Sequence, residues 1–268
     1  MTNAVTTFRK LHVNTTPLRL PNAWDAGSAR LFESIGATAI ATTSAGMAWS
    51  LGYQDGRLLP IDEVVGATSR MARVLNVPLS FDIENGYSDD PKVVADTVAR
   101  LIDVGVAGIN IEDGSDTPAL LASKIDAIRT SASKAGADIF INARCDVFLG
   151  RLVEDSRLVD ESITRGKLYA NAGADGLFLP GLVSAKDITD VVASISLPLN
   201  VMAWPGLAEA VELGKLGVRR LSAGSGISQA LWGKAEVLAK EFLHSGRSET
   251  VFEGAMSYPQ LQALFNGK

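Results

Sequence analysis

An alternation of short apolar runs with longer segments of helical period repeats along most of the chain and limits the folds open to it. Such alternation is typical of βα units, which build a parallel sheet. We expect eight strands, at residues 18–20, 38–43, 79–83, 108–112, 138–143, 176–179, 199–202 and 219–222. The expected helices between them span residues 26–35, 61–75, 91–104, 120–135, 155–172, 185–194 and 206–216.

Four of these helices end next to a glycine, at Gly36, Gly105, Gly173 and Gly217. A glycine just past a helix can take the left-handed conformation that caps it, and here an apolar run follows at once. Eight such units without a break in composition favour an α/β fold of the (β/α)8, TIM-barrel type. A doubly wound sheet would more often show about five or six strands and one switch point.

The 268 residues suit one barrel domain at 1–245, because α/β barrels run to about 250 residues as a single domain. Residues 229–245 are expected to form a further helix, and 246–268 a helical tail. Many apolar side chains lie in this last part of the chain: Val237, Leu238, Phe242, Val251, Phe252, Met256, Leu261, Leu264 and Phe265. They need a surface to bury against, so the tail either packs on a neighbouring subunit or folds back over its own barrel. We favour the neighbour and expect a homo-oligomer.

Charge and residue usage exclude several classes of protein. The chain has 25 Lys and Arg against 30 Asp and Glu, without a long basic run, so a nucleic acid partner is not expected. Cys145 is the single cysteine, and the two histidines, His12 and His244, lie near opposite ends. A disulfide framework, a thiolate zinc site and a Ser-His-Asp triad therefore lack material. No apolar stretch approaches the roughly 18 residues of a membrane span, and residues 1–14 lack a signal-peptide core, so we expect no membrane partner and a cytoplasmic protein.

Polar residues gather where the expected strands end, which is where the active site of a barrel lies. They are Asn22, Asp25, Ser44, Asp82, Glu84, Glu112, Asp113, Asn142, Arg144, Asp146 and Asn200. Side chains two apart on a strand share a face, so Asp82 with Glu84, and Asn142 with Arg144, point to the barrel mouth together. Asp113 and Cys145 then face the helices, where Cys145 serves as a small apolar core residue.

Several carboxylates that converge in a mouth repel one another unless a cation lies among them. A hard divalent ion such as Mg²⁺, which prefers carboxylate and water oxygens, suits this set. The alternative is that Asp82 and Glu84 merely cap the following helix. Arg144 is either a partner in a structural ion pair or a fork that binds a substrate carboxylate.

Two further observations bear on the reaction. No lysine stands at the end of an expected strand, so a Schiff-base aldolase has no evident nucleophile. The glycine-rich turn at residues 222–226 could cradle a phosphate with backbone N–H groups, or it could simply let the chain turn tightly into the last helix.

These strand ends carry motifs that resemble the isocitrate lyase and phosphoenolpyruvate mutase superfamily of Mg²⁺-dependent enzymes acting on 2-oxo acids. The similar segments are Leu-Pro-Asn-Ala-Trp-Asp-Ala-Gly-Ser-Ala at 20–29, Thr-Ser-Ala-Gly at 43–46, Gly-Tyr-Gln-Asp-Gly at 52–56, Asp-Ile-Glu-Asn-Gly-Tyr at 82–87, Gly-Ile-Asn-Ile-Glu-Asp at 108–113 and Asn-Ala-Arg-Cys-Asp at 142–146. Their order along the chain, with five of the six at an expected strand end, makes the resemblance specific.

The resemblance implies a role for each matching position. Asp82 would bind Mg²⁺ directly, while Asp55, Glu84 and Glu112 would hold its water ligands. The substrate would be bound by Arg144, by the Ser44 hydroxyl and by the backbone around Ala45 and Gly46. Asn200 matches a further polar substrate position, and Arg144 and Glu112 are the expected catalytic residues. Tetramers with C-terminal helices that reach neighbouring subunits are also implied.

Departures from the family pattern bear on the reaction. Glu84 replaces the usual Asp of the metal motif. Lyases of the superfamily carry a long gating loop with a catalytic Cys after the Glu-Asp pair, whereas residues 114–121 are few and contain neither Cys nor His. Mutase and phosphonate-cleaving members use a histidine near the end of the sixth strand, where this chain has Pro180.

The matching residues thus provide an electron sink, but no evident general acid or base. Mg²⁺ chelated by a 2-oxo acid, with Arg144 beside it, would stabilise an enolate. We therefore expect a Mg²⁺-dependent lyase for a small 2-oxo acid, by oxaloacetate-like decarboxylation or a related carbon-carbon cleavage. One alternative is a carbon-phosphorus hydrolase or mutase, such as a phosphonopyruvate hydrolase. The other, from a different class, is a non-catalytic 2-oxo acid binding protein.

Overall fold

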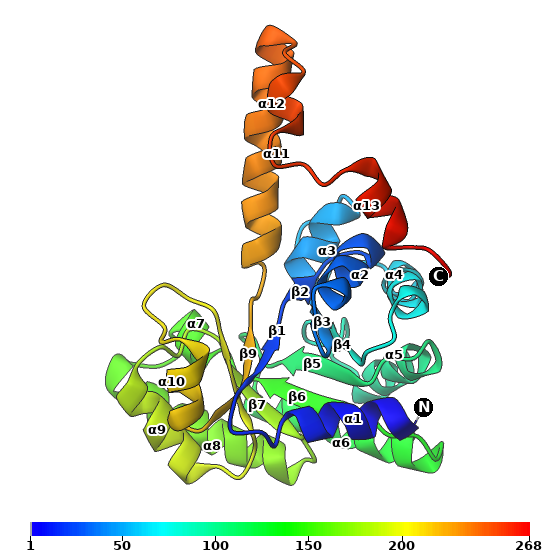
Figure 1. The fold of residues 1–268 in the computed structure, drawn as a ribbon. Helices are drawn as coiled ribbons and strands as arrows, with labels where there is room; N and C mark the ends of the chain where they lie inside the picture. Colours follow the sequence, from blue (N-terminus) through cyan, green and yellow to red (C-terminus); the bar gives the residue numbers. More distant parts are fainter. Residues whose placement is uncertain (1) are drawn as a thin grey trace.

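The computed structural model describes residues 2–268, so Met1, the first residue of the expected barrel domain, lies outside the described residues. The described chain forms nine parallel strands in the order β1-β9-β8-β7-β6-β5-β4-β3-β2. Their bounds are β1 Leu18–Leu20, β2 Asn22–Ala23, β3 Ile40–Thr42, β4 Leu79–Asp82, β5 Gly108–Glu112, β6 Phe140–Arg144, β7 Gly176–Leu179, β8 Leu199–Met202 and β9 Val218–Ser222. Figure 1 shows the strands at the centre, with most of the helices around them.

The ninth strand arises because the first strand of the barrel is divided at Pro21. β1 pairs with β9 on one side, and β2 pairs with β3 on the other. Proline has no backbone N–H to donate to a ladder, so it interrupts the strand at this point. The two short pieces together join the two edges of the sheet, and the expected (β/α)8 barrel is confirmed.

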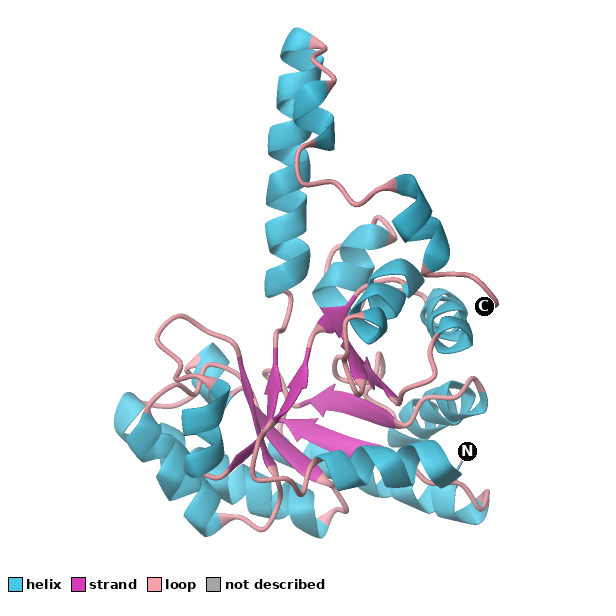
Figure 2. Cartoon of the chain, in the orientation of Figure 1, coloured by secondary structure: helices cyan, strands magenta, loops and turns pink. Residues whose placement is uncertain are grey.

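Helices follow the strands in the alternating order that the sequence indicates (Figure 2). Their bounds are α1 Thr2–Leu11, α2 Ala26–Ser34, α3 Ser44–Ser50, α4 Ile61–Val74, α5 Pro91–Asp103, α6 Pro118–Lys134, α7 Val147–Gly150, α8 Leu158–Asn171, α9 Ala185–Ser194, α10 Ala210–Lys215, α11 Gly226–Ser245, α12 Glu249–Phe252 and α13 Tyr258–Ala263, with a 3-10 turn at Asp155–Arg157. The helix expected at 206–216 is shorter than predicted, because residues 203–209 form a loop. No described helix has the length and apolar character needed to cross a membrane.

Helix α1 was not expected, and it closes the end of the barrel where the strands begin. Val5 and Phe8 are buried in a cluster with Leu18, Leu20 and other residues at that end. A Cβ atom on Gly108 would lie 2.8 Å from Cε1 of Phe8, so the glycine makes room for the aromatic ring. The barrel is therefore filled from this end, and the carboxyl ends of its strands are left for a site.

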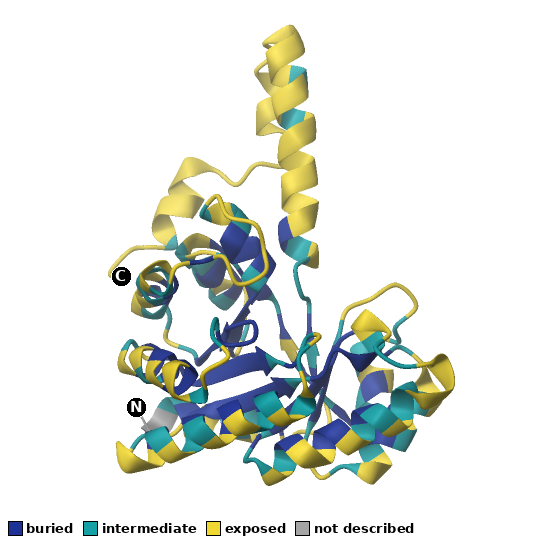
Figure 3. Ribbon diagram, turned by 180° about the vertical axis from the view of Figure 1, so that it is seen from behind, coloured by how far each residue is buried: buried dark blue, intermediate teal, exposed yellow. Residues whose placement is uncertain are grey.

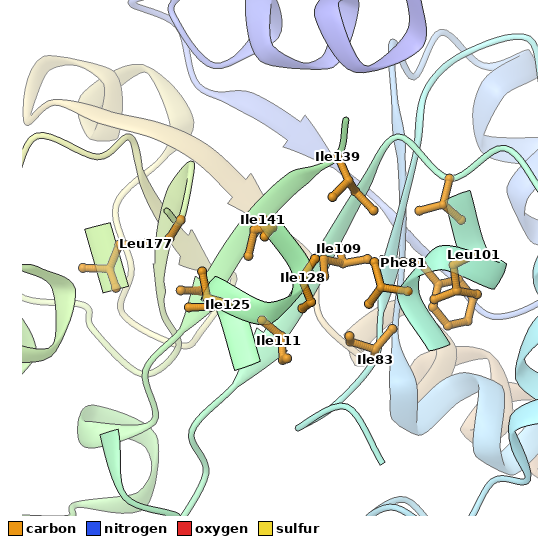
Figure 4. Packing of buried hydrophobic residues seen from close by; sticks show 14 of the residues in the cluster. Phe81, Ile83, Leu101, Ile109, Ile111, Ile125, Ile128, Ile139, Ile141 and Leu177 are labelled. Carbon is orange, nitrogen blue, oxygen red and sulfur yellow. The ribbon is translucent and has the colours of Figure 1, made fainter. Parts of the chain in front are cut away.

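The main core lies between the outer face of the sheet and the surrounding helices (Figure 4). Ile109 and Ile111 of β5 and Ile141 of β6 are fully buried in one cluster with Ile125 and Ile128 of α6. Removal of this apolar surface from water stabilises the barrel by about 25 cal/mol per Å². The strands hold their carboxyl ends in place because both of their faces are packed.

Helix α11 extends away from the barrel beyond its first turns, as Figures 1 and 3 show. Only Ser228 of its 20 residues is buried, whereas Trp232 is 54% and Leu243 is 84% exposed. Helix α12 lies along α11, and the chain then returns to its own barrel. There Arg30 Nε donates to the carbonyl oxygen of Leu264 at 2.7 Å. The end of the tail thus contacts its own barrel, as do the first turns of α11 near Trp24 and Ser50, while the rest of α11 is exposed.

Candidate active site

Three adjacent strands end in charged residues. Asp82 is the last residue of β4, Glu112 of β5 and Arg144 of β6. Glu112 and Arg144 are register partners in the parallel ladder, so their side chains leave the sheet on the same face. The strand ends therefore bring together two acids and an arginine that lie far apart in sequence.

Arg144 is bound by two carboxylates in this arrangement. Its Nη1 lies 2.7 Å from Glu112 Oε2, and its Nε and Nη2 donate to Asp146 at 2.6 and 3.0 Å. Although burial opposes the charge, Glu112 and Asp146 raise the pKa of Arg144 above its ordinary value. The structural ion pair is thus present. Since a guanidinium has five N–H donors, about two remain for a substrate.

Glu84 lies in a tight turn that follows β4 and has an unusual backbone conformation. Glu84 has a φ of 52°, Gly86 of 95° and Tyr87 of 60°. Residues other than glycine rarely adopt positive φ, so the surrounding contacts must hold this turn. A Cβ atom on Gly86 would come within 2.7 Å of Val94, which explains the glycine there. The turn is a built feature of the mouth.

Neither Asp82 nor Glu84 caps the following helix. The N-cap of α5 is Asp90, whose carboxylate accepts from the N–H of Lys92 at 2.8 Å. Asp82 instead accepts from the N–H of Glu84 at 3.1 Å, and Glu84 accepts from the N–H of Arg57. The alternative of helix capping is therefore wrong, and both carboxylates are available at the mouth.

Burial and mutual repulsion disfavour the charged forms of these acids. Burial raises the pKa of Asp82, although Arg144 opposes the shift, and it raises the pKa of Glu84 to about 7. Burial likewise raises the pKa of Glu112, with Arg144 opposing and Asp82 adding to the shift. Asp55, in the exposed loop 51–60, raises the pKa of both Asp82 and Glu84. The group is therefore short of positive charge.

A divalent cation would relieve this repulsion, and the donors fit one. They are all oxygens, as Mg²⁺ prefers. In the described residues, no three Asp, Glu, His or Cys side chains are arranged to hold an ion by themselves. Mg²⁺ usually keeps several waters, so an ion here would need only one direct carboxylate ligand, and the other acids could bind its waters.

Ser44, Ala45 and Gly46 form the first turn of α3, directly after β3 at the same end of the barrel. Ser44 is half-buried, while Ala45 and Gly46 are buried. A Cβ atom on Gly46 would lie 2.7 Å from Cγ2 of Thr43 and 2.9 Å from Cβ of Trp24. Only a glycine lets this turn lie so close to Thr43 and Trp24.

Asn200 does not join the other predicted residues at the mouth. It is the second residue of β8, is 1% exposed and accepts from Asn142 Nδ2 at 3.0 Å. Its own Nδ2 donates to the carbonyl oxygen of Val201 at 2.7 Å and to Ser222 Oγ at 3.2 Å. The side chain lies in a hydrogen-bonded layer inside the barrel, together with Asn142 and Asn110.

Asp113 and Cys145 face the helices, as the alternation predicted. Both are 0% exposed. Asp113 accepts from Arg165 Nη1 at 2.9 Å, from the Tyr169 hydroxyl and from the N–H of Asp146 at 2.9 Å. Asp113 thereby fixes the turn that carries Asp146 and, through it, Arg144.

Tyr87 is a residue to which the sequence assigned no role, although it closes the metal motif. Burial raises the pKa of its phenol above the ordinary value, and Glu84, Asp82, Asp55 and Glu112 add to the shift in that order. The hydroxyl therefore stays protonated close to the acids.

The glycine-rich turn at residues 222–226 is bound to the barrel, because the N–H of Gly224 donates to Asn22 Oδ1 at 2.9 Å.

A parallel barrel with paired carboxylates and an arginine at the ends of β4, β5 and β6 defines an enzyme of the phosphoenolpyruvate mutase/isocitrate lyase superfamily. The family model described as phosphoenolpyruvate phosphomutase matches residues 8–243. The chain belongs to that family.

Individual relatives agree with this assignment. An uncharacterized protein of Mycobacterium tuberculosis (strain CDC 1551 / Oshkosh) is 40% identical over 222 residues, 81% of each chain. An oxaloacetate decarboxylase of Pseudomonas fluorescens (strain SBW25) is 29% identical over 227 residues, 82% of this chain and 78% of that one. A solved phosphonopyruvate hydrolase complex with oxalate and Mg²⁺ shares the fold, with a TM-score of 0.85, 20% identity and coverage of 98% of this chain and 95% of the other.

Proposed function

We propose that the protein is a Mg²⁺-dependent carbon-carbon lyase that decarboxylates a small oxaloacetate-like 2-oxo acid through an enolate. The observation that carries the proposal is the group of acids around Arg144, which has no imidazole or thiol beside it. Cys145 is buried toward the helices, His12 lies at the opposite end of the barrel and His244 is near the end of α11. β-Decarboxylation suits such a site, because it needs an electron sink more than a protein base.

The metal would be held mainly by Asp82, with Asp55, Glu84 and Glu112 binding its waters. When bound, Mg²⁺ would supply positive charge where negative charge develops on the enolate oxygen. The oxalate and Mg²⁺ in the related hydrolase support this proposal, since oxalate has the planar, doubly charged shape of a pyruvate enolate.

The substrate carboxylate would be bound by the remaining N–H groups of Arg144, with Ser44 and the backbone of Ala45 and Gly46 facing it. Glu112 keeps Arg144 in the mouth through their 2.7 Å contact. Asn200, which we expected to touch substrate, would act only through the Asn142 layer below. The Tyr87 hydroxyl, whose pKa is raised by burial and by the charges of Glu84 and Asp82, can return a proton to the enolate carbon.

Incubation with oxaloacetate, phosphonopyruvate or 2-methylisocitrate separates the candidate reactions. Free Mg²⁺ itself promotes loss of CO₂ from oxaloacetate, so each rate is compared with that of Asp82→Asn at equal Mg²⁺. We expect the wild-type protein to form pyruvate from oxaloacetate faster than Asp82→Asn does. Release of phosphate from phosphonopyruvate would instead show a carbon-phosphorus hydrolase, and conversion of phosphonopyruvate to phosphoenolpyruvate a mutase. Tight Mg²⁺-dependent binding without turnover would show a binding protein.

We also propose that α11 forms the contact of a homo-oligomer. Leu231 and Trp232 are 50% and 54% exposed, and they line a pocket with Trp24 and Ser50 beside the barrel. A second copy of α11 offers a matching apolar surface, and burial of such a helix face stabilises a dimer or tetramer.

A further inference from the structure

Three loops that carry or follow Asp55, Glu84 and Glu112 are joined to one another. Loop 51–60 carries Asp55, turn 83–90 carries Glu84, and turn 113–117 follows Glu112. Five side chains link them: Arg57, Asn85, Asp89, Asp116 and Lys124. We propose that Arg57 and Lys124 are positioning residues that hold the three loops in the arrangement that binds the metal ion. This inference rests on the proposed metal site.

Arg57 connects its own loop to both of the others. Its Nη2 lies 2.7 Å from Asp116 Oδ2, in the turn after Glu112. Its Nη1 lies 3.6 Å from Asp89 Oδ1, in the turn after Glu84. Its backbone N–H also donates to the Glu84 carboxylate, from a residue with a φ of 69°. One residue thus spans the three acid-bearing segments.

Lys124 supports the turn around Glu84 from the helix side. It lies on α6, is 1% exposed, and its Nζ donates to the carbonyl oxygen of Asn85 at 2.9 Å. Asn85 Nδ2 in turn donates to Asp116 Oδ2 at 3.3 Å. Lysine is almost never fully buried without a partner, because removing an ammonium group from water is costly. Here the buried ammonium holds the carbonyl next to Glu84, in a turn with positive φ.

These contacts matter for the metal because the acids repel one another. If these contacts hold the mutually repelling carboxylates in place, the free-energy cost of bringing them together is already met in the metal-free protein. The affinity for the ion is then higher. Partners of this indirect kind change metal affinity by about 10- to 100-fold when they are removed. A merely structural role would lower the melting temperature and leave the affinity of the folded protein unchanged.

Mn²⁺ binding, followed by the loss of the free-ion electron paramagnetic resonance signal, tests the inference without any substrate. The variants are Arg57→Ala, which keeps the backbone N–H, and Lys124→Met. Arg100→Ala is the matched control, because Arg100 pairs with Asp62 at 2.6 Å between α5 and α4, away from the three loops. We expect about 10-fold weaker Mn²⁺ binding for the first two variants and wild-type binding for the control.

A double-mutant cycle over Arg57→Ala and Asp116→Asn adds a second criterion. Their effects on the Mn²⁺ dissociation constant should be less than additive, since both remove the same link. Wild-type Mn²⁺ affinity in Arg57→Ala, or an equal loss in Arg100→Ala, would overturn the inference. Failure of the wild-type protein itself to bind Mn²⁺ would instead reject the proposed metal site. If Lys124→Met does not fold, the Arg57→Ala variant, which changes an exposed side chain, still tests the inference.

Discussion

Arg144 and Asp146 form a two-pronged ion pair at the mouth of the barrel, with Nε and Nη2 of the arginine on the two carboxylate oxygens at 2.6 and 3.0 Å. The N–H of Asp146 is itself held by Asp113 at 2.9 Å. These contacts hold the guanidinium plane of Arg144 in one orientation. The contact with Glu112 further restricts the direction of the remaining N–H donors. Preorganisation of this kind strengthens the binding of a developing anion.

Replacement of Arg144 by lysine should lower turnover by at least 100-fold, because a point charge cannot keep both Asp146 oxygens and still reach a substrate carboxylate. Steady-state kinetics on the substrate found for the wild-type protein measure the change. Activity within a few-fold of wild type would count against the role of Arg144.

Asp82→Ala should abolish Mg²⁺-dependent activity and metal binding while the barrel remains folded, since a side chain at a strand end contributes little to the core. Calorimetric titration with Mg²⁺ and a thermal melt measure the two properties separately. Metal dependence that survives in Asp82→Ala refutes its assignment as the direct ligand.

The metal-free protein should lose stability as pH rises from about 5 to above 7. Burial raises the pKa of Glu84 from its ordinary value of 4.5 to about 7, so the folded state holds a proton that the unfolded state has released. The contribution of protonated Glu84 to the free energy of unfolding is complete below pH 4.5 and is lost as the pH rises through 7. Glu84→Gln should reduce the slope by up to about 1.4 kcal/mol per pH unit. Urea titrations in a chelator at several pH values test this, and an unchanged slope in the variant would contradict it.

Gly108→Ala should destabilise the barrel by about 1–3 kcal/mol, because the added Cβ would meet the Phe8 ring at 2.8 Å. Gly66→Ala in α4 is the control, since its nearest neighbour would be Arg70 Nη1 at 3.6 Å. That change should stabilise the helix by about 0.5–1 kcal/mol. Equal unfolding midpoints for the two variants would show that α1 does not plug the barrel.

The full chain should form an oligomer that Trp232→Asp weakens, because a charge on this exposed apolar helix face opposes burial. Light scattering gives the mass of each protein, together with that of a chain ending at Ser245. Loss of the oligomer in the shortened chain would assign the contact to residues 246–268. A full chain that is already monomeric would remove α11 as an interface.

Local pattern was enough for the strands and the acids. The expected strands at 108–112, 176–179 and 199–202 coincide with β5, β7 and β8, because their apolar residues, such as Ile109, Ile111 and Val201, are buried against the helices. Asp82, Glu112 and Arg144 were found in the same way, since a barrel places its site wherever strands end. Helix α1 was not predicted, because it precedes the first strand and so lies outside the alternation of strands and helices.

Contacts between distant segments decided the rest. Asn200 looked like a mouth residue, yet its side chain is buried inside the barrel, where Asn142 and Ser222 bind its amide. Arg57, Asp116 and Lys124 gave no signal in the chain, because charged residues in loops and helices are ordinarily solvated. They acquire a role only where folding brings three loops within hydrogen-bond distance and removes an ammonium group from water. Such long-range geometry has no counterpart in local periodicity, so it first becomes visible in the folded barrel.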